Sequence, residues 1–176
     1  MRKQFLFLVA LVAITMTSCF KEDMSVGTID GYAPVYISKT DAFITTVKAA
    51  QKLGIPGKMY LSNNLIYVTD VGTGVHIIDN TIPSAPVKLK FISIPGVHDV
   101  AVKGGVLYAD NLTDLVAFNV SDINNITFAK RVKNVYPLEN QLYPEFATGY
   151  FDCADTTKGY IIRWDKATLK NPKCYK

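Results

Sequence analysis

Two stretches of the sequence share one pattern, about forty residues apart. Residues 63–80, NNLIYVTDVGTGVHIIDN, read as two apolar strands with turns on either side, and residues 104–122, GGVLYADNLTDLVAFNVSD, have much the same form. Asn63-Asn64 and Gly104-Gly105 are two-residue turns that tolerate a positive φ, which is a strong hairpin signal between apolar strands. The sequence therefore predicts a β unit that occurs twice.

Each unit is long enough for four short strands. They are predicted at residues 57–62, 65–70, 74–79 and 87–94 in the first unit and at residues 97–103, 106–111, 114–120 and 128–135 in the second. Four strands in about 40 residues is the size of one β-propeller blade. Ten Tyr and nine Phe residues, with many Val and Ile, also favour β structure. We therefore expect an all-β, β-propeller-like fold, with repeats at residues 54–95 and 96–135 in a single domain over residues 35–176.

Two blades are fewer than a propeller needs, because propellers typically close with about four to eight. Two blades alone leave unpaired edges and an exposed core face. The strand-like segments APVYIS at residues 33–38 and GYIIRWD at residues 159–165 are candidates to pair into a third, partial blade. The alternatives are that a partner chain supplies the cover, or that the chain is a shortened relative of longer proteins.

One short helix is expected near residues 40–48. Thr40 is a suitable N-cap, Phe43 and Val47 share one face, and Gly54 and Pro56 follow as terminators. The β-branched run over residues 44–47 weakens this prediction.

The first residues form a leader. Arg2 and Lys3 precede a short apolar run, which is typical of a secretory signal peptide and too short for a membrane span. The MTSC sequence that follows resembles the lipobox of bacterial lipoproteins, which implies a signal peptide over residues 1–18, lipidation of Cys19 and a tether over residues 19–34. The alternative is an ordinary signal peptide in which Cys19 has no role.

Charged residues follow this cysteine. Lys21, Glu22 and Asp23 resemble the surface-export signal of Bacteroidetes lipoproteins, which implies an outer-membrane lipoprotein exposed at the cell surface. A solvated tether, or an anchor that faces the periplasm, is the alternative. No other long apolar segment is present, so the lipid on Cys19 is the expected membrane attachment.

The chain has three cysteines, an odd number for an exported protein. Lipidation of Cys19 leaves the pair Cys153 and Cys174. An oxidising compartment allows that pair to form a disulfide, and the alternative is two free thiols.

The repeat resembles a known family. GVHIIDNTIPSAP at residues 74–86 and DLVAFNVSDINN at residues 114–125 are similar to the LVIVD repeat, and IPGKMYL and IPGVHDVAVKGGVLYADN are similar to its Bacteroidetes lipoprotein branch. The resemblance implies blade-type architecture in an exported protein. It implies little about function, because propellers serve as enzymes, binders and scaffolds.

Few residues point to chemistry. His76 lies within a strand and is expected either to pack or to occupy a surface position. His98 and Asp99 begin a blade where loops cluster, so they are weak candidates for ligand or metal binding or for base catalysis. No third ligand stands at a recognisable spacing, so no metal, cofactor or catalytic residue is assigned. Asp70, Asp79, Asp99 and Asp110 recur near strand ends, where turn capping is the commoner role and a Ca²⁺ or sugar site the alternative.

The C-terminal segment is rich in aromatic residues. Tyr143, Phe146, Tyr150, Phe151, Tyr160 and Trp164 are candidates either for a platform that stacks on sugars or for packing onto the blades. The formal charge of +4 falls to +2 without Arg2 and Lys3, and no basic cluster is present, which argues against a nucleic-acid partner.

We therefore expect a lipid-anchored binding or scaffold module with a protein or glycan partner. The alternative is an enzyme, or an enzyme subunit, with its site at the blade loops around His98 and Asp99. A shortened paralogue that works only inside a larger assembly is a third possibility.

Overall fold

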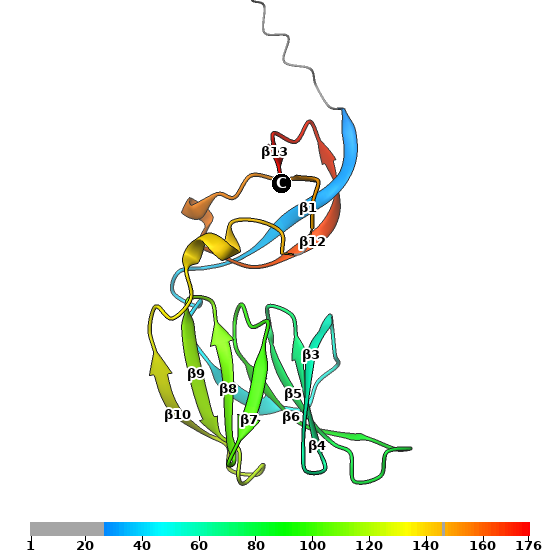
Figure 1. The fold of residues 1–176 in the computed structure, drawn as a ribbon, viewed down its shortest axis with the longest axis vertical. Helices are drawn as coiled ribbons and strands as arrows, with labels where there is room; N and C mark the ends of the chain where they lie inside the picture. The colour runs from blue at the N-terminus through cyan, green and yellow to red at the C-terminus, as the bar shows by residue number, and fades with distance from the viewer. Residues whose placement is uncertain (1–26, 146) are drawn as a thin grey trace, which may run out of the picture.

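The computed structural model describes residues 27–176 apart from residue 146. The leader, Cys19 and the charged residues at 21–23 therefore lie outside the described residues. Three β-sheets make up the rest (Figure 1), two of them side by side and the third across one end of both. The all-β expectation is confirmed.

The first blade consists of five strands. The four predicted strands are β3 (Pro56–Ser62), β4 (Leu65–Asp70), β5 (Gly74–Asp79) and β6 (Val87–Ser93). A further strand, β2 (Thr46–Ala49), pairs with β6, so that the order in the sheet is β2-β6-β5-β4-β3. Asn63 in the turn between β3 and β4 has φ of 53°, a conformation that Asn tolerates.

The second blade repeats the four-strand unit. Its strands are β7 (Val100–Lys103), β8 (Val106–Asn111), β9 (Asp114–Asn119) and β10 (Thr127–Val132), in the order β10-β9-β8-β7. Gly104 and Gly105 both have positive φ, as a tight hairpin turn requires. The predicted four-strand repeat is confirmed.

The main core lies between the inner faces of the two blades. Tyr67, Val75 and Ile77 of the first blade belong to the same buried cluster as Leu107 and Phe118 of the second. Residues of β4 to β9 make up this cluster, and they alternate along these strands because successive side chains in a strand face opposite sides. The blades therefore cover each other's apolar faces.

The helix expected near residues 40–48 is wrong. Residues 39–43 form turns instead, with the Ser38 hydroxyl accepting from the Asp41 amide at 3.1 Å, and β2 begins at Thr46. The β-branched residues of this segment suit a strand, and the free edge of β6 offers backbone partners, so that Val47 pairs with Ile92. Tertiary pairing therefore outweighs the local helix signals.

The chain ends form a third sheet, here called the terminal sheet. Its strands are β1 (Thr28–Ile37), β11 (Tyr150–Phe151), β12 (Tyr160–Lys170) and β13 (Cys174–Tyr175), in the order β12-β1-β11-β13. The segments 33–38 and 159–165 do pair with each other, antiparallel, but in this separate sheet rather than in a partial blade. Because β1 begins at Thr28, the tether expected over residues 19–34 overlaps a strand.

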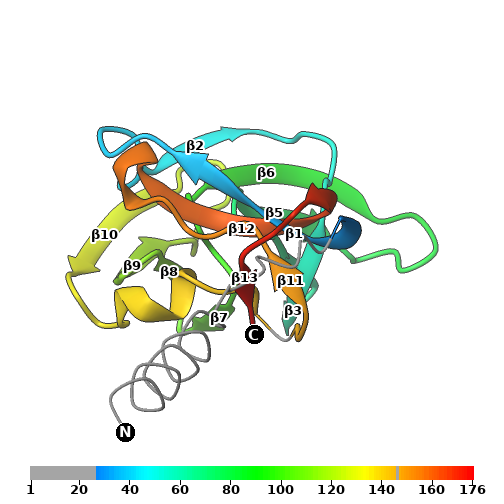
Figure 2. The ribbon, with the colours of Figure 1, turned by 90° about the horizontal axis from the view of Figure 1, so that it is seen from above.

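The terminal sheet lies across the turns at one end of the blades (Figure 2). Ile162 of β12 packs with Ala42 and with Leu112, which lies in the turn between β8 and β9. At the turn between β4 and β5 the approach is close, since a Cβ on Gly72 would lie 2.5 Å from the carbonyl oxygen of Ile162. The sheet thus closes one end of the blade pair.

A disulfide joins Cys153 to Cys174, with the Cα atoms 5.3 Å apart. It holds β13 beside β11, where Phe151 pairs with Cys174. Two short 3₁₀ turns, η1 (Leu138–Gln141) and η2 (Thr156–Lys158), complete the C-terminal segment. Within residues 27–176, no helix has the length and apolar character to cross a membrane.

Candidate functional site

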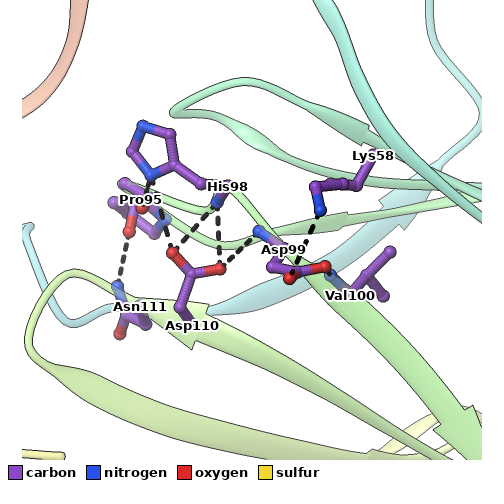
Figure 3. A network of polar contacts seen from close by, with 8 residues as sticks. Lys58, Pro95, His98, Asp99, Val100, Asp110 and Asn111 are labelled. Carbon is purple, nitrogen blue, oxygen red and sulfur yellow. Dashed lines mark hydrogen bonds and ion pairs between the residues drawn. The ribbon is translucent and has the colours of Figure 1, made fainter. Parts of the chain in front are cut away.

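Asp110 organises the start of the second blade. It lies near the end of β8, and its Oδ1 accepts hydrogen bonds from the backbone amides of His98 at 2.9 Å and Asp99 at 2.7 Å (Figure 3). An Asp at a strand end can satisfy backbone donors that no neighbouring strand reaches. The carboxylate therefore fixes where His98 and Asp99 lie.

The His98 ring is held by one nitrogen. Its Nδ1 lies 2.9 Å from the Gly96 carbonyl oxygen and 3.5 Å from Asp110 Oδ2. Because both of these oxygens accept, Nδ1 is the nitrogen that carries the proton. Nε2 points away from Asp110 (Figure 3), and so it is the nitrogen left for another partner.

The pKa of His98 lies above its ordinary value of 6.5. Burial of the ring acts against protonation, but the hydrogen bond and the negative charge of Asp110 outweigh it, with smaller contributions from Glu145 and the Gly96 carbonyl. The imidazole is therefore protonated over a wider pH range than a free histidine.

Asp99 is already engaged. Its Oδ1 accepts from the Val100 amide at 2.8 Å, and its Oδ2 lies 3.9 Å from Lys58 Nζ on β3. Both side chains of this ion pair are more than two-thirds exposed, so it adds little stability. Asp110, rather than the neighbouring Asp99, is the carboxylate that supports His98.

A cleft lies between the terminal sheet and the adjacent ends of the blades, and residues of both blades line it. It comprises two adjoining cavities of about 240 and 480 Å³, which together fall within the size range of small-molecule sites. The residues that line both are His98, Asp99, Glu145, Arg163 and Trp164. The two sequence candidates thus lie where the two cavities meet.

Aromatic rings form much of the wall of the cleft. Tyr136 and Tyr143, on the irregular segment between β10 and β11, line the smaller cavity and are 40% and 49% exposed. The Trp164 indole donates to the Gln141 carbonyl at 3.1 Å and packs edge-on against Phe151. These rings are therefore both fixed in place and partly accessible.

The opposite wall contains a β-bulge. Val35 of β1 pairs with Arg163 and Tyr36 with Ile161, so Ile162 is an extra residue in β12. A bulge turns adjacent side chains toward a site that regular alternation would not allow. Ile161, Ile162 and Arg163 all line the cleft as a result.

Other carboxylates named in the sequence cap turns. Asp79 Oδ1 accepts from the Thr81 amide at 2.8 Å, and Asp70 accepts from the amides of Gly54 and Ile55, both at 2.8 Å. Among residues 27–176 no cluster of three or more His, Cys, Asp or Glu side chains is arranged to hold a metal ion. Asp79 therefore caps its own turn, as expected, whereas Asp70 and Asp110 bind backbone amides of segments that are more distant in the sequence.

His76 packs in the interior, which is one of the two roles that the sequence leaves open for it. Its ring is fully buried, with the centroid 4.7 Å from that of Phe91, and its Nε2 lies 3.3 Å from Asp70 Oδ2. It therefore lines neither cavity of the cleft.

Several cleft residues were missed by sequence reasoning. Tyr136, Gln141, Glu145 and Arg163 belong to no motif, although Trp164 and Tyr143 were in the aromatic set. Other members of that set pack elsewhere: Tyr150 contacts Tyr175, and Tyr160 contacts Phe43. Phe146 lies outside the described residues.

Comparisons with protein-family models, with curated proteins and with solved structures find no match for this chain.

Proposed function

We propose that this protein is an exported, lipid-anchored binding module of LVIVD type, and that the cleft beneath the terminal sheet is its ligand site. The observation that carries the proposal is the meeting of His98, partly exposed aromatic rings and charged side chains at one concave place. Concave sites with a few convergent polar groups are the usual form of ligand sites.

The anchor rests on the leader and on where β1 begins. Cys19 resembles a lipidated cysteine, and β1 starts at the end of the terminal sheet farthest from the blades (Figure 1). An anchor there would leave the blades and the cleft pointing away from the membrane. Surface exposure, implied by Lys21, Glu22 and Asp23, would give the cleft access to external ligands.

The anchor can be tested by labelling. Cells that express the full chain and grow with an alkyne-tagged fatty acid are expected to label this protein, and Cys19→Ala should remove both the label and the membrane association. A Cys19→Ala protein that keeps the label would exclude this residue as the lipid site.

The binding role can be tested by photocrosslinking on intact cells. A photoreactive amino acid at Tyr143, in the cleft, is expected to capture a ligand or partner. The matched control is Tyr108 on β8, which has a similar exposed fraction, 40% against 49%, but lines no cavity of the cleft. Equal capture at the two positions would contradict the proposal.

An enzyme is the second candidate, and one observation favours it. Asp110 and Gly96 hold Nδ1 of His98 as the protonated nitrogen, which leaves Nε2 in the arrangement of a general base. No Ser, Thr or Cys of the described chain lines the cleft, so a base acting on water is the form this activity would take. His98→Gln would then abolish turnover while leaving capture at Tyr143 intact.

A further inference from the structure

We infer that the ligand of the cleft is a neutral oligosaccharide, bound along both cavities. This inference rests on the proposed binding function and names its ligand class. Three features of the cleft support it: balanced charge, open hydrogen-bonding groups and exposed aromatic rings.

The charges in the cleft largely balance one another. Arg163 is paired with Asp165 through two contacts of 2.9 and 3.2 Å, and Lys58 is paired with Asp99. Asp110 lies 3.5 Å from His98 Nδ1, which leaves Glu145 as the carboxylate of the cleft without a described partner. An anionic ligand would therefore meet Glu145 with no free cation among the described lining residues except protonated His98. Protonated His98, whose charge interacts with Glu145, opposes a cationic ligand in turn.

Open polar groups remain. Glu145 is exposed and has no hydrogen-bond partner among the described residues. His98 Nε2, which points away from Asp110, is a second such group (Figure 3). Both accept hydrogen bonds, the imidazole nitrogen when the ring is neutral, so a ligand that donates hydroxyl groups would satisfy them. Sugars supply several hydroxyl groups on one ring.

The aromatic rings supply the apolar part of such a site. Tyr136, Tyr143 and Trp164 line the smaller cavity, and Tyr32 and Trp164 line the larger one. Aromatic rings with one polar end present a flat apolar face beside a hydrogen-bonding group. The C–H face of a sugar ring matches that surface, and rings in both cavities suit a chain of two or more units.

Trp164 provides a direct reporter, because it is the only Trp of the chain. The mature chain, in detergent, is titrated with neutral hexasaccharides of glucose, mannose and galactose, and with hexagalacturonate as the acidic counterpart, while its fluorescence is recorded. We expect saturable quenching or enhancement by at least one neutral hexasaccharide and not by hexagalacturonate. Glu145→Gln and Tyr143→Ala should each weaken that binding by about tenfold.

Tyr108→Ala is the matched control and should leave the affinity unchanged. Stronger binding of hexagalacturonate than of every neutral sugar would overturn the inference. So would capture of a protein at Tyr143 on cells with no response to any sugar, and the proposed binding function would then stand without this ligand class. Failure of both the titration and the capture would remove the proposed function as well.

Discussion

In both blades an aspartate at a strand end accepts hydrogen bonds from two consecutive backbone amides, but the histidine beside it is buried in one blade and partly exposed in the other. In the first blade Asp70 binds the amides of Gly54 and Ile55 and contacts His76, whose ring is fully buried. In the second blade Asp110 binds two consecutive amides in the same way, but its histidine, His98, is about one-third exposed and borders the cleft. The two aspartates occupy equivalent strand ends of the repeat.

The two histidines differ in exposure because different segments lie over the two aspartates. In the first blade, residues 50–55 connect β2 at one edge of the sheet to β3 at the other and pass over this end. In the second blade the bound segment is the short link between β6 and β7, and the terminal sheet and the segment between β10 and β11 lie beyond it across the cleft. Both repeats thus use an aspartate to hold a backbone segment in place. A candidate site forms only beside Asp110, where the neighbouring histidine borders the cleft beneath the terminal sheet.

The largest expected effect on stability follows from removing the Asp70 carboxylate. Asp70→Ala removes a buried carboxylate that accepts from the Gly54 and Ile55 amides and contacts the fully buried His76, so we expect it to lower the free energy of unfolding by about 3 kcal/mol. Asp110→Ala should cost less, because Asp110 and His98 are less buried, but it should weaken ligand binding, which Asp70→Ala should not. Urea unfolding and the Trp164 titration measure the two effects. Equal effects of both variants on binding would contradict the distinction.

Loss of the disulfide tests whether the terminal sheet is a separate layer over Asp110 and His98. The double variant Cys153→Ser, Cys174→Ser frees a loop that includes all of β12, and it should lower the free energy of unfolding by roughly 2–4 kcal/mol. The terminal sheet should exchange its amide hydrogens faster while the blades remain protected, as measured by hydrogen exchange. Uniform loss of protection in all three sheets would show that the terminal sheet is not a separate cover.

The two histidines give a smaller, paired effect. His76→Gln disturbs a fully buried ring against Phe91 and should lower the free energy of unfolding by about 1–3 kcal/mol, whereas His98→Gln should change it by about 0.5 kcal/mol or less. In ligand binding the order reverses, with loss only for His98→Gln. A large stability loss for His98→Gln would mark that ring as a packing residue.

The smallest expected effect is the pH dependence of stability. The pKa of His98 is raised in the folded protein above the ordinary value of about 6.5. Its contribution to the free energy of unfolding is therefore full below about pH 6.5 and is lost as the pH rises through the higher pKa of the folded state. Burial acts to raise the pKa of Asp70, but hydrogen bonds from the Gly54 and Ile55 amides and His76 lower it overall. The contribution of Asp70 to the free energy of unfolding is therefore present at pH values above its ordinary pKa, and it is lost as the pH falls through the lowered pKa of the folded state. Urea midpoints from pH 3 to 9 should show that His98→Gln flattens only the neutral-to-alkaline part.

Much of the blade structure can be predicted from the sequence, because alternating apolar residues and the turns at Asn63 and Gly104 are local signals. The strand-like pattern of residues 33–38 and 159–165 also makes the pairing of β1 with β12 one of the candidate arrangements, although not their place in a separate sheet. The segment 40–48 could not be predicted, since its conformation depends on the free edge of β6. The cleft could not either, because Tyr136, Glu145 and Arg163 meet only through the placement of the terminal sheet and the bulge at Ile162.

The central claim is that His98 borders a ligand site whereas His76 is enclosed in the first blade. The most direct test of it is ¹⁵N NMR of the imidazoles, since the chain has only two histidines. Above its pKa, His98 should carry its proton on Nδ1, and its Nε2 signal should move when a neutral hexasaccharide that alters Trp164 fluorescence is added. The His76 signals should not move. A His98 protonated on Nε2 in its neutral form, or a response at His76 in place of His98, would contradict the account.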